Sequence, residues 1–127
     1  MHLTTASKVH FEYIDDDWHA QYEQMNLTDW IDQGTPYDTG SVMQYGSYGY
    51  AAYNYTPTMT YVENGVDTGV PVEGQRDGAS SMDIWQICKL YGCGKCNGFI
   101  IDSYDGDAYK NYMNKCTNAD RYYWSSR

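Results

Sequence analysis

Basic residues are scarce in this sequence, and their scarcity limits the partners that the chain can bind. Only 8 Lys and Arg stand against 17 Asp and Glu among 127 residues, which gives a formal net charge of −9 at pH 7. No cluster of basic residues is visible along the chain. Because nucleic acids and anionic membrane surfaces are themselves negatively charged, the composition predicts that neither is a partner.

Long apolar runs are also missing. No run approaches the roughly 20 residues that a membrane-spanning helix needs. The N-terminal region lacks the basic-then-apolar plan of a signal peptide. If the protein is secreted, we expect its export signal to lie outside this chain.

Cysteine is missing from most of the chain, because none precedes Cys88. The sequence holds four, at Cys88, Cys93, Cys96 and Cys116. The CxxC spacing of Cys93 and Cys96 suits a metal or redox pair, but no second CxxC or His pair lies at finger-like spacing, so disulfide bonding is favoured. Two N-x-[ST] acceptors, Asn26 and Asn54, are glycosylation candidates. Both features favour an oxidising, extracellular setting.

Tyrosine is abundant, with 15 residues, and aromatic residues reach 17% of the chain. The length suits one domain or half of a larger one. We expect an α+β fold with a large irregular share, in which amphipathic rings hold loops and a few short strands. Residues 1–10 should be ragged or extended, followed by a short strand near Phe11–Ile14. Short helical turns are expected at about 21–30 and 107–115.

The clearest regular element is a helix predicted over about 81–91. Ser80 followed three residues later by Asp83 forms a variant of the capping box, which satisfies free amides at a helix start. Gly92 stands where a C-cap belongs. Apolar residues recur at helical spacing and predict one apolar stripe, made of Ile84, Ile87, Leu90 and Tyr91.

The stretch from Gly34 to Gly46 contains too many turn formers for a regular element. Its glycines, Pro36 and Asp38 predict a tight turn. The turn carries a thioether, Met43, and two residues later a phenol, Tyr45. An apolar group and an ionisable group are therefore held close together. Such a pair could lie beneath and beside a metal ion.

Two segments of the chain resemble the astacin family of zinc endopeptidases. The run from Pro36 to Gly46 is similar to the family's Met-turn, YDYxSxMHYG, with Gln44 in place of the usual His. The run from Gly74 to Cys93 closely resembles the family ending, GQRxxLSxxDIxxIxxLYxC. The resemblance covers Phe11 to Cys93. It implies that residues 1–93 form the C-terminal half of an astacin-like peptidase domain and that residues 94–127 form a Cys-containing extension.

The resemblance also implies roles for individual residues. In this family the Met forms an apolar floor under the zinc-binding histidines, a role that falls to Met43. The Tyr is a switchable zinc ligand that moves toward the substrate oxyanion, which implies both a metal and a catalytic role for Tyr45. The family cysteine that matches Cys93 bonds to the N-terminal half, so here Cys93 must pair locally, pair with another chain or stay free.

The family's zinc motif, HExxHxxGxxH, is missing. The three histidines, His2, His10 and His19, are spaced by 8 and 9 residues, which puts no two on one helical face. His2 falls within about one residue of the third zinc histidine when the register of Phe11 is extended backward. His2 is therefore a zinc-ligand candidate. The simpler interpretation is that all three histidines lie at exposed loop positions. The zinc helix would lie before Met1.

Two hypotheses of different classes follow. The first is that the chain is part of a secreted zinc metalloendopeptidase, which hydrolyses peptide bonds in a peptide or protein substrate and is inactive as this chain alone. Zinc would be its cofactor, and its own missing N-terminal half would be a partner. The second is a non-catalytic secreted binding or structural module that keeps the scaffold and has lost the chemistry.

Overall fold

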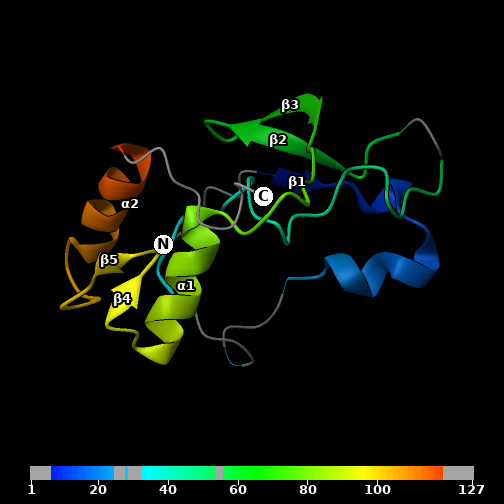
Figure 1. Cartoon of the computed structure of the whole chain (residues 1–127). Helices are drawn as coiled ribbons and strands as arrows, with labels where there is room; N and C mark the ends of the chain where they lie inside the picture. Colours follow the sequence, from blue (N-terminus) through cyan, green and yellow to red (C-terminus); the bar gives the residue numbers. More distant parts are fainter. Residues whose placement is uncertain (1–6, 25–27, 29–32, 54–55, 119–127) are drawn as a thin grey trace. The chain divides into compact units, whose positions relative to one another are not determined.

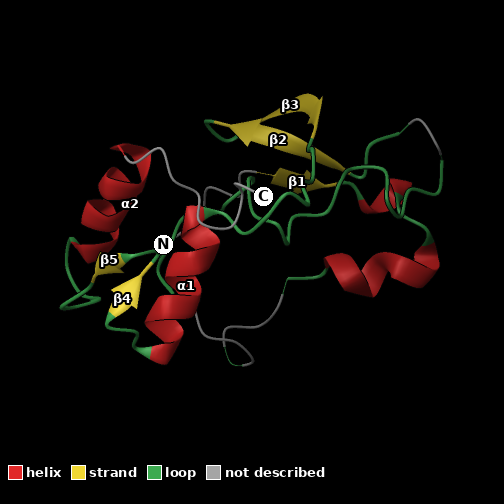
Figure 2. Ribbon diagram, viewed as in Figure 1, coloured by secondary structure: helices red, strands yellow, loops and turns green. Residues whose placement is uncertain are grey.

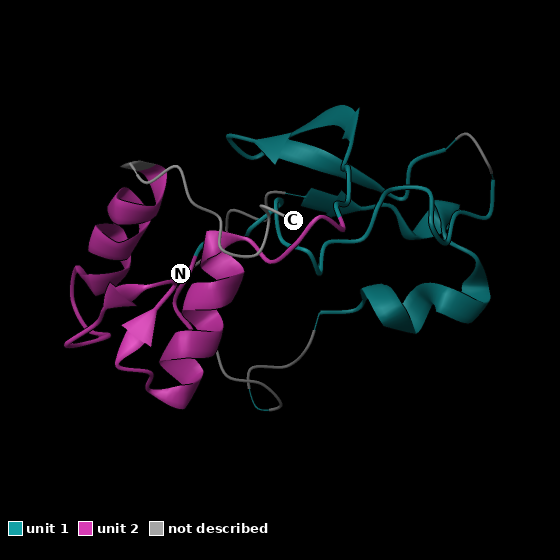
Figure 3. Ribbon diagram, in the orientation of Figure 1, with its two compact units in different colours: residues 1–32, 36–75 teal, residues 33–35, 76–127 magenta. Residues whose placement is uncertain are grey.

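The computed structural model describes residues 7–24, 28, 33–53 and 56–118. The chain divides into two compact units (Figure 3). Unit 1 comprises Met1–Asp32 and Pro36–Gln75, and unit 2 comprises Gln33–Thr35 and Arg76–Arg127. Both combine helices with a small sheet, so the expected mixture of α and β is confirmed. The expected division at residue 93 follows family resemblance rather than compactness, and it stays a prediction.

Unit 1 contains a three-stranded antiparallel sheet with the order β1-β2-β3 (Figure 1). The strands are β1 (Ser7–Val9), β2 (Met59–Glu63) and β3 (Val66–Pro71). Lys8 lies opposite Thr60, and Val62 lies opposite Asp67. Asn64 and Gly65, with φ of 51° and 77°, form the tight connection between β2 and β3, where both central residues of the favoured turn need positive φ.

The strand expected near Phe11–Ile14 is wrong, because this segment forms a short 3-10 helix, and a second 3-10 helix follows it (Figure 2). These are η1 (Phe11–Tyr13) and η2 (Asp16–Tyr22). The Asp15 side chain accepts a hydrogen bond from the Asp17 amide at 3.1 Å, and this cap turns the chain into η2 instead of letting it extend. Of the helical turn expected at about 21–30, η2 supplies only the first residues, and 25–27 and 29–32 lie outside the described part.

The core of unit 1 packs against the segment that follows the predicted turn. Its buried members are Ile14, Tyr22, Met59 and Val72. Ser47 lies beside them, fully buried, with its hydroxyl 2.6 Å from the Met59 carbonyl oxygen and 2.7 Å from that of Val72. Since a buried polar group is stable only with a partner, this network fixes the chain that leaves the turn against β2.

The first helix of unit 2 is the predicted one, and α1 (Ser81–Tyr91) has the expected bounds. The Ser80 side chain accepts from the Asp83 amide and the Asp83 side chain accepts from the Ser80 amide, so the capping box is complete. Gly92 ends the helix in the left-handed conformation with φ of 61°. These local signals were confirmed because they act within a few residues of each other.

The predicted apolar stripe of α1 does not face the core. Its first member, Ile84, is buried, but Ile87, Leu90 and Tyr91 are 57%, 52% and 76% exposed. The buried face consists instead of Ser81, Ile84, Trp85 and Cys88. Tertiary packing on one side of the helix therefore selects a different face from the one that spacing alone indicated.

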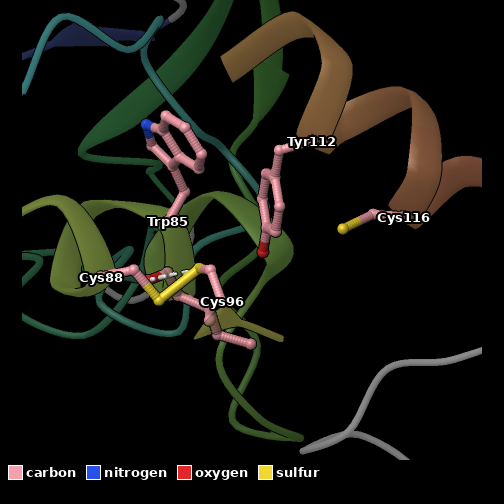
Figure 4. Packing of buried hydrophobic residues seen from close by; sticks show 6 residues of the cluster. Trp85, Cys88, Cys96, Tyr112 and Cys116 are labelled. Atoms are coloured by element: carbon pink, nitrogen blue, oxygen red, sulfur yellow. Dashed lines mark hydrogen bonds between the residues drawn. A yellow bond between two sulfur atoms is a disulfide. The ribbon is translucent and has the colours of Figure 1, made fainter. Parts of the chain in front are cut away.

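The rest of unit 2 packs on this face. A two-stranded hairpin, β4 (Lys95–Cys96) and β5 (Phe99–Ile100), is followed by α2 (Ala108–Asn118), close to the helix expected at 107–115. Tyr112 of α2 is buried beside Trp85 (Figure 4). Its hydroxyl donates to the Ser81 carbonyl at 2.7 Å. This contact joins the two helices.

The cysteines lie in and beside this core. Cys88 and Cys96 form a disulfide, with their Cα atoms 5.8 Å apart, whereas Cys93 and Cys116 are free thiols (Figure 4). The bond joins α1 to the hairpin and does not use the CxxC pair itself. No helix in the described part of the chain is both long and apolar enough to span a membrane.

Candidate functional site

The predicted tight turn lies in unit 1 and is built from short-range hydrogen bonds. The Ser41 amide donates to the Asp38 carbonyl at 3.2 Å, and the Gln44 amide donates to the Ser41 carbonyl at 3.1 Å. Side chains add to these turns, because Asp38 Oδ1 accepts from the Gly40 amide at 2.9 Å and Ser41 Oγ accepts from the Met43 amide at 3.1 Å. Short polar residues that bond to nearby main-chain amides are the usual means of stabilising such turns.

Gln44 occupies the centre of the turn and is buried, with 7% of its surface exposed. Its Oε1 accepts a hydrogen bond from the Tyr37 hydroxyl. Its Nε2 lies 3.2 Å from the carbonyl oxygen of Tyr45 and 3.9 Å from the sulfur of Met59. The Tyr37 hydroxyl in turn accepts from Ser7 Oγ at 3.1 Å, so the side chain of Gln44 connects the turn to β1 and β2.

Gly74 and Gln75 support the turn from outside. A Cβ on Gly74 would lie 2.8 Å from the Gln44 carbonyl oxygen and 2.9 Å from the Gly46 nitrogen, closer than such atoms approach. Gln75 Nε2 donates to the Gly40 carbonyl at 2.9 Å. The first two residues of the GQR motif therefore hold this turn, which explains why a glycine stands at position 74.

The two residues that resemble site residues lie in different environments. Met43 is 79% exposed, so its thioether is at the surface of the described structure. The Tyr45 ring is half-buried and makes edge contacts with Tyr22 and Tyr50, at centroid distances of 5.5 and 5.8 Å. The Tyr45 hydroxyl has no hydrogen-bond partner among the described residues. Its ring is thus fixed by packing alone, and its polar end is available.

The Tyr22 phenol beside Tyr45 is uncharged. Burial raises its pKa above the ordinary value, a hydrogen bond with Thr58 acts in the opposite direction, and the neighbouring phenols of Tyr45 and Tyr50 raise the pKa further. A phenol with a raised pKa stays protonated at neutral pH. Tyr45 therefore packs against a neutral ring.

The histidines of the described part are engaged at separate places. His10 Nε2 lies 2.9 Å from the Thr60 hydroxyl, which donates to Asp67 at 2.6 Å. His19 Nε2 lies 3.0 Å from the Ile14 carbonyl oxygen. Nowhere in the described ranges do three His, Cys, Asp or Glu side chains gather in a way that could hold a metal ion. The described residues therefore do not fit a primary zinc site.

Some candidate residues lie beyond what the structure describes. These are the zinc-ligand candidate His2 and the glycosylation candidates Asn26 and Asn54. Their roles stay predictions, as do those of Met43 and Tyr45. Sequence reasoning missed the buried position of Gln44 and the packing role of Gly74. The departure from the family pattern at Gln44 and the GQR motif itself were the signals that pointed to them.

Comparison with known proteins supports the resemblance of this turn. The model of the Astacin peptidase family matches residues 6–92. The chain is 37% identical over 113 residues to Embryonic protein UVS.2 of Xenopus laevis, an alignment that covers 84% of this chain and 20% of that protein. It is 48% identical over 58 residues to Zinc metalloproteinase nas-38 of Caenorhabditis elegans, covering 46% of this chain and 8% of that protein.

A solved structure shows the same similarity in three dimensions. High choriolytic enzyme 1, a hatching enzyme zinc-protease from the Medaka fish Oryzias latipes, matches with a TM-score of 0.57 and 29% identity. The match covers 68% of this chain and 40% of that chain. The matched part of the chain therefore has the fold of the corresponding part of this zinc-protease. The chain belongs to the astacin family, and it spans a fifth or less of the length of the two relatives above.

Proposed function

We propose that this chain is part of a secreted zinc metalloendopeptidase and supplies the Met-turn side of its catalytic site. The observation that carries the proposal is the turn itself, whose main chain is fixed by Gln44 and Gly74 while the Tyr45 hydroxyl makes no bond with the described residues. A phenol held in this way can donate a hydrogen bond to the oxyanion that forms when a peptide bond is attacked. The substrate class is a peptide or protein.

The zinc ligands must come from residues other than the described ones. We propose that a segment with the HExxHxxGxxH motif, the missing N-terminal half, completes the site, and that the chain alone does not cleave peptides. The exposed face of α1, with Ile87, Leu90 and Tyr91, and the exposed Met43 are apolar surfaces that such a partner can cover. Burial of apolar surface would favour the association.

An extracellular location agrees with the structure. The Cys88–Cys96 disulfide joins α1 to the hairpin of unit 2. Disulfides persist in oxidising compartments and are rare in the cytosol. We therefore propose that the protein acts outside the cell.

The test compares the purified chain with a fusion in which the preceding part of the Medaka hatching enzyme, including its zinc motif, is joined upstream. Zinc content and cleavage of casein are measured with and without chelator. We expect the fusion to bind zinc stoichiometrically and to cleave in a chelator-sensitive manner. In the fusion, Tyr45→Phe should lower kcat by roughly 100-fold, the usual cost of losing one oxyanion donor. Tyr48→Phe, at an exposed tyrosine of the same unit, is the matched control.

Each other outcome has a definite meaning. Stoichiometric zinc and cleavage by the chain alone would show that the chain holds its own ligands, with His2 and His10 as the first to mutate. A zinc-loaded fusion in which Tyr45→Phe equals Tyr48→Phe would remove the proposed role of Tyr45. A folded fusion without zinc or cleavage would favour the non-catalytic binding or structural module.

A further inference from the structure

Gln44 differs from the residue that the family pattern has at its position, and the structure shows what its amide does. The side chain is buried, and its neighbours include the Tyr37 hydroxyl, the Tyr45 carbonyl oxygen and the Met59 sulfur. One of these groups donates a hydrogen bond to Gln44 and two accept one from it. Gln44 thus has a specific bonding pattern within a few ångströms of Tyr45.

We propose that Gln44 is a positioning residue for Tyr45, one that fixes the main chain of Tyr45 and thereby sets where its ring lies. The inference rests on the proposed function, in which the Tyr45 phenol faces the substrate. Gln44 acts through the main chain, because its Nε2 donates to the carbonyl oxygen of Tyr45 and not to the phenol. It touches no reacting atom itself.

The chemistry of the amide explains why glutamine suits this place. A primary amide carries an acceptor oxygen and two N–H donors, which matches one donating and two accepting neighbours. A neutral imidazole has one donor and one acceptor nitrogen, so a histidine could serve only two of the three neighbours. A glutamate would keep the acceptor for Tyr37 but would place a carboxylate against the Tyr45 carbonyl oxygen.

Other contacts restrain the same piece of main chain. The Gln44 amide donates to the Ser41 carbonyl and the Ser47 amide donates to the Val72 carbonyl, both at 3.1 Å. Gly74 packs directly against the peptide groups between Gln44 and Gly46. The main chain is therefore held before, at and after Tyr45.

The Tyr45 ring is held by packing against the core of unit 1, whereas its main chain is held by hydrogen bonds. It has edge contacts with Tyr22 and Tyr50 and no hydrogen bond to the described residues. Aromatic pairs of this kind stabilise one arrangement of the rings. Since the ring projects from the main chain that Gln44 holds, a shift of that main chain would displace the ring from these contacts.

The experiment uses the purified chain and needs neither metal nor cleavage. Gln44→Glu and Gln44→His are compared with Gln24→Glu, which makes the same change at an exposed glutamine of unit 1. Amide hydrogen exchange of Gln44 and Ser47 reports on the main chain, and NMR contacts of the Tyr45 ring with Tyr22 and Tyr50 report on the ring. Tyr112 of unit 2 serves as an internal reference.

We expect Gln44→Glu to speed exchange at both amides by roughly tenfold, as for loss of a buried hydrogen bond, and to displace the Tyr45 ring signals. Gln44→His should give a smaller effect because one donor remains. Gln24→Glu and the Tyr112 signals should not change. If Gln44→Glu and Gln44→His show the same amide exchange rates and the same Tyr45 ring contacts as the wild type, the inference is overturned.

The same variant separates this inference from the proposed function. In the zinc-motif fusion, Gln44→Glu should lower kcat with little change in KM, since a displaced phenol affects the transition state more than substrate binding. If the fusion never cleaves but Gln44→Glu still displaces Tyr45 in the chain, the positioning role stands and the proposed function fails. If cleavage is normal and Tyr45 is not displaced, the positioning role fails alone.

Discussion

Gly74 is the single residue whose replacement the turn tolerates least. A methyl group there would meet main-chain atoms of Gln44 and Gly46 at 2.8 and 2.9 Å, and main chain cannot move aside as a flexible side chain can. We expect Gly74→Ala to lower the free energy of unfolding of unit 1 by about 1–3 kcal/mol, the usual cost of overpacking. Urea unfolding, monitored through the NMR signal of Ser47, measures this free energy.

Gly49→Ala is the matched control, because a Cβ at Gly49 would meet only the Gly46 carbonyl oxygen at 3.9 Å, an ordinary contact. It should unfold within about 0.5 kcal/mol of the wild type, as surface substitutions do. Equal unfolding midpoints for the two variants would show that the turn can shift away from Gly74.

Asp67 makes the stability of unit 1 depend on pH. The hydrogen bond from Thr60, then that from the Gly69 amide, and then the nearby charges of His10 and Lys8 lower the pKa of its carboxyl group. A group whose pKa is lower in the folded state stabilises that state above its unfolded pKa of about 4, and the contribution is lost as pH falls through the folded pKa. Asp67→Asn removes this contribution.

We therefore expect the wild type to be more stable than Asp67→Asn at pH 6, with the difference shrinking as the pH falls below about 4. Urea midpoints of unit 1 between pH 6 and pH 2.5 measure it. Asp102→Asn, at an exposed carboxylate of unit 2, should leave the unit 1 midpoint unchanged at every pH. A pH-independent difference for Asp67→Asn would mean that the asparagine acts through shape rather than charge.

Among single residues, the sequence predicted those that act on close neighbours in the chain. Ser80, Asp83 and Gly92 were recognised because a capping box and a left-handed C-cap depend on neighbours within a few positions. Gln44 was noticed only as a departure from a pattern. Its partners Ser7, Tyr37 and Met59 come from distant parts of the chain, and sequence spacing alone does not bring them together.

Helix α1 is the element on which unit 2 is assembled, and its start is set by Ser80. The Ser80 hydroxyl accepts from the Asp83 amide at 3.0 Å. We expect Ser80→Ala to destabilise unit 2 by about 1 kcal/mol, as for other N-caps. Ser80→Thr should restore most of the loss, because it keeps a hydroxyl. Urea unfolding followed by Trp85 fluorescence is the measurement, and equal losses for both variants would rule out the cap as the cause.

Regular elements differ in how well the sequence predicts them, for a physical reason. The helices are built from contacts within a turn or two, so their periodicity and caps are visible in the chain. The sheet joins β1 to β2, about fifty residues later, as in the pair Lys8 and Thr60. Nothing in the residues around Phe11 signals that pairing, and η1, which replaced the expected strand, has no side-chain cap that the sequence could reveal.

The exposed face of α1 is a feature of the molecule as a whole. Spacing identified its apolar residues, but which of them are buried depends on α2 and the disulfide. Ile87, Leu90 and Tyr91 leave an apolar surface on a chain with a net charge of −9, and contiguous exposed apolar surface favours association. Charge repulsion opposes that association at neutral pH.

We therefore expect the chain to be monomeric at pH 7.5 in low salt and to associate near pH 4.4, its isoelectric point, where the repulsion vanishes. Replacing Ile87 and Leu90 together by Gln, a good helix former, should abolish most of this association and leave stability within about 0.5 kcal/mol. The control replaces Val66 and Val70 of β3, which are 66% and 53% exposed, by Thr. Sedimentation equilibrium at both pH values measures the mass. If the β3 control suppresses association equally, the apolar face of α1 is not the surface through which the chains meet.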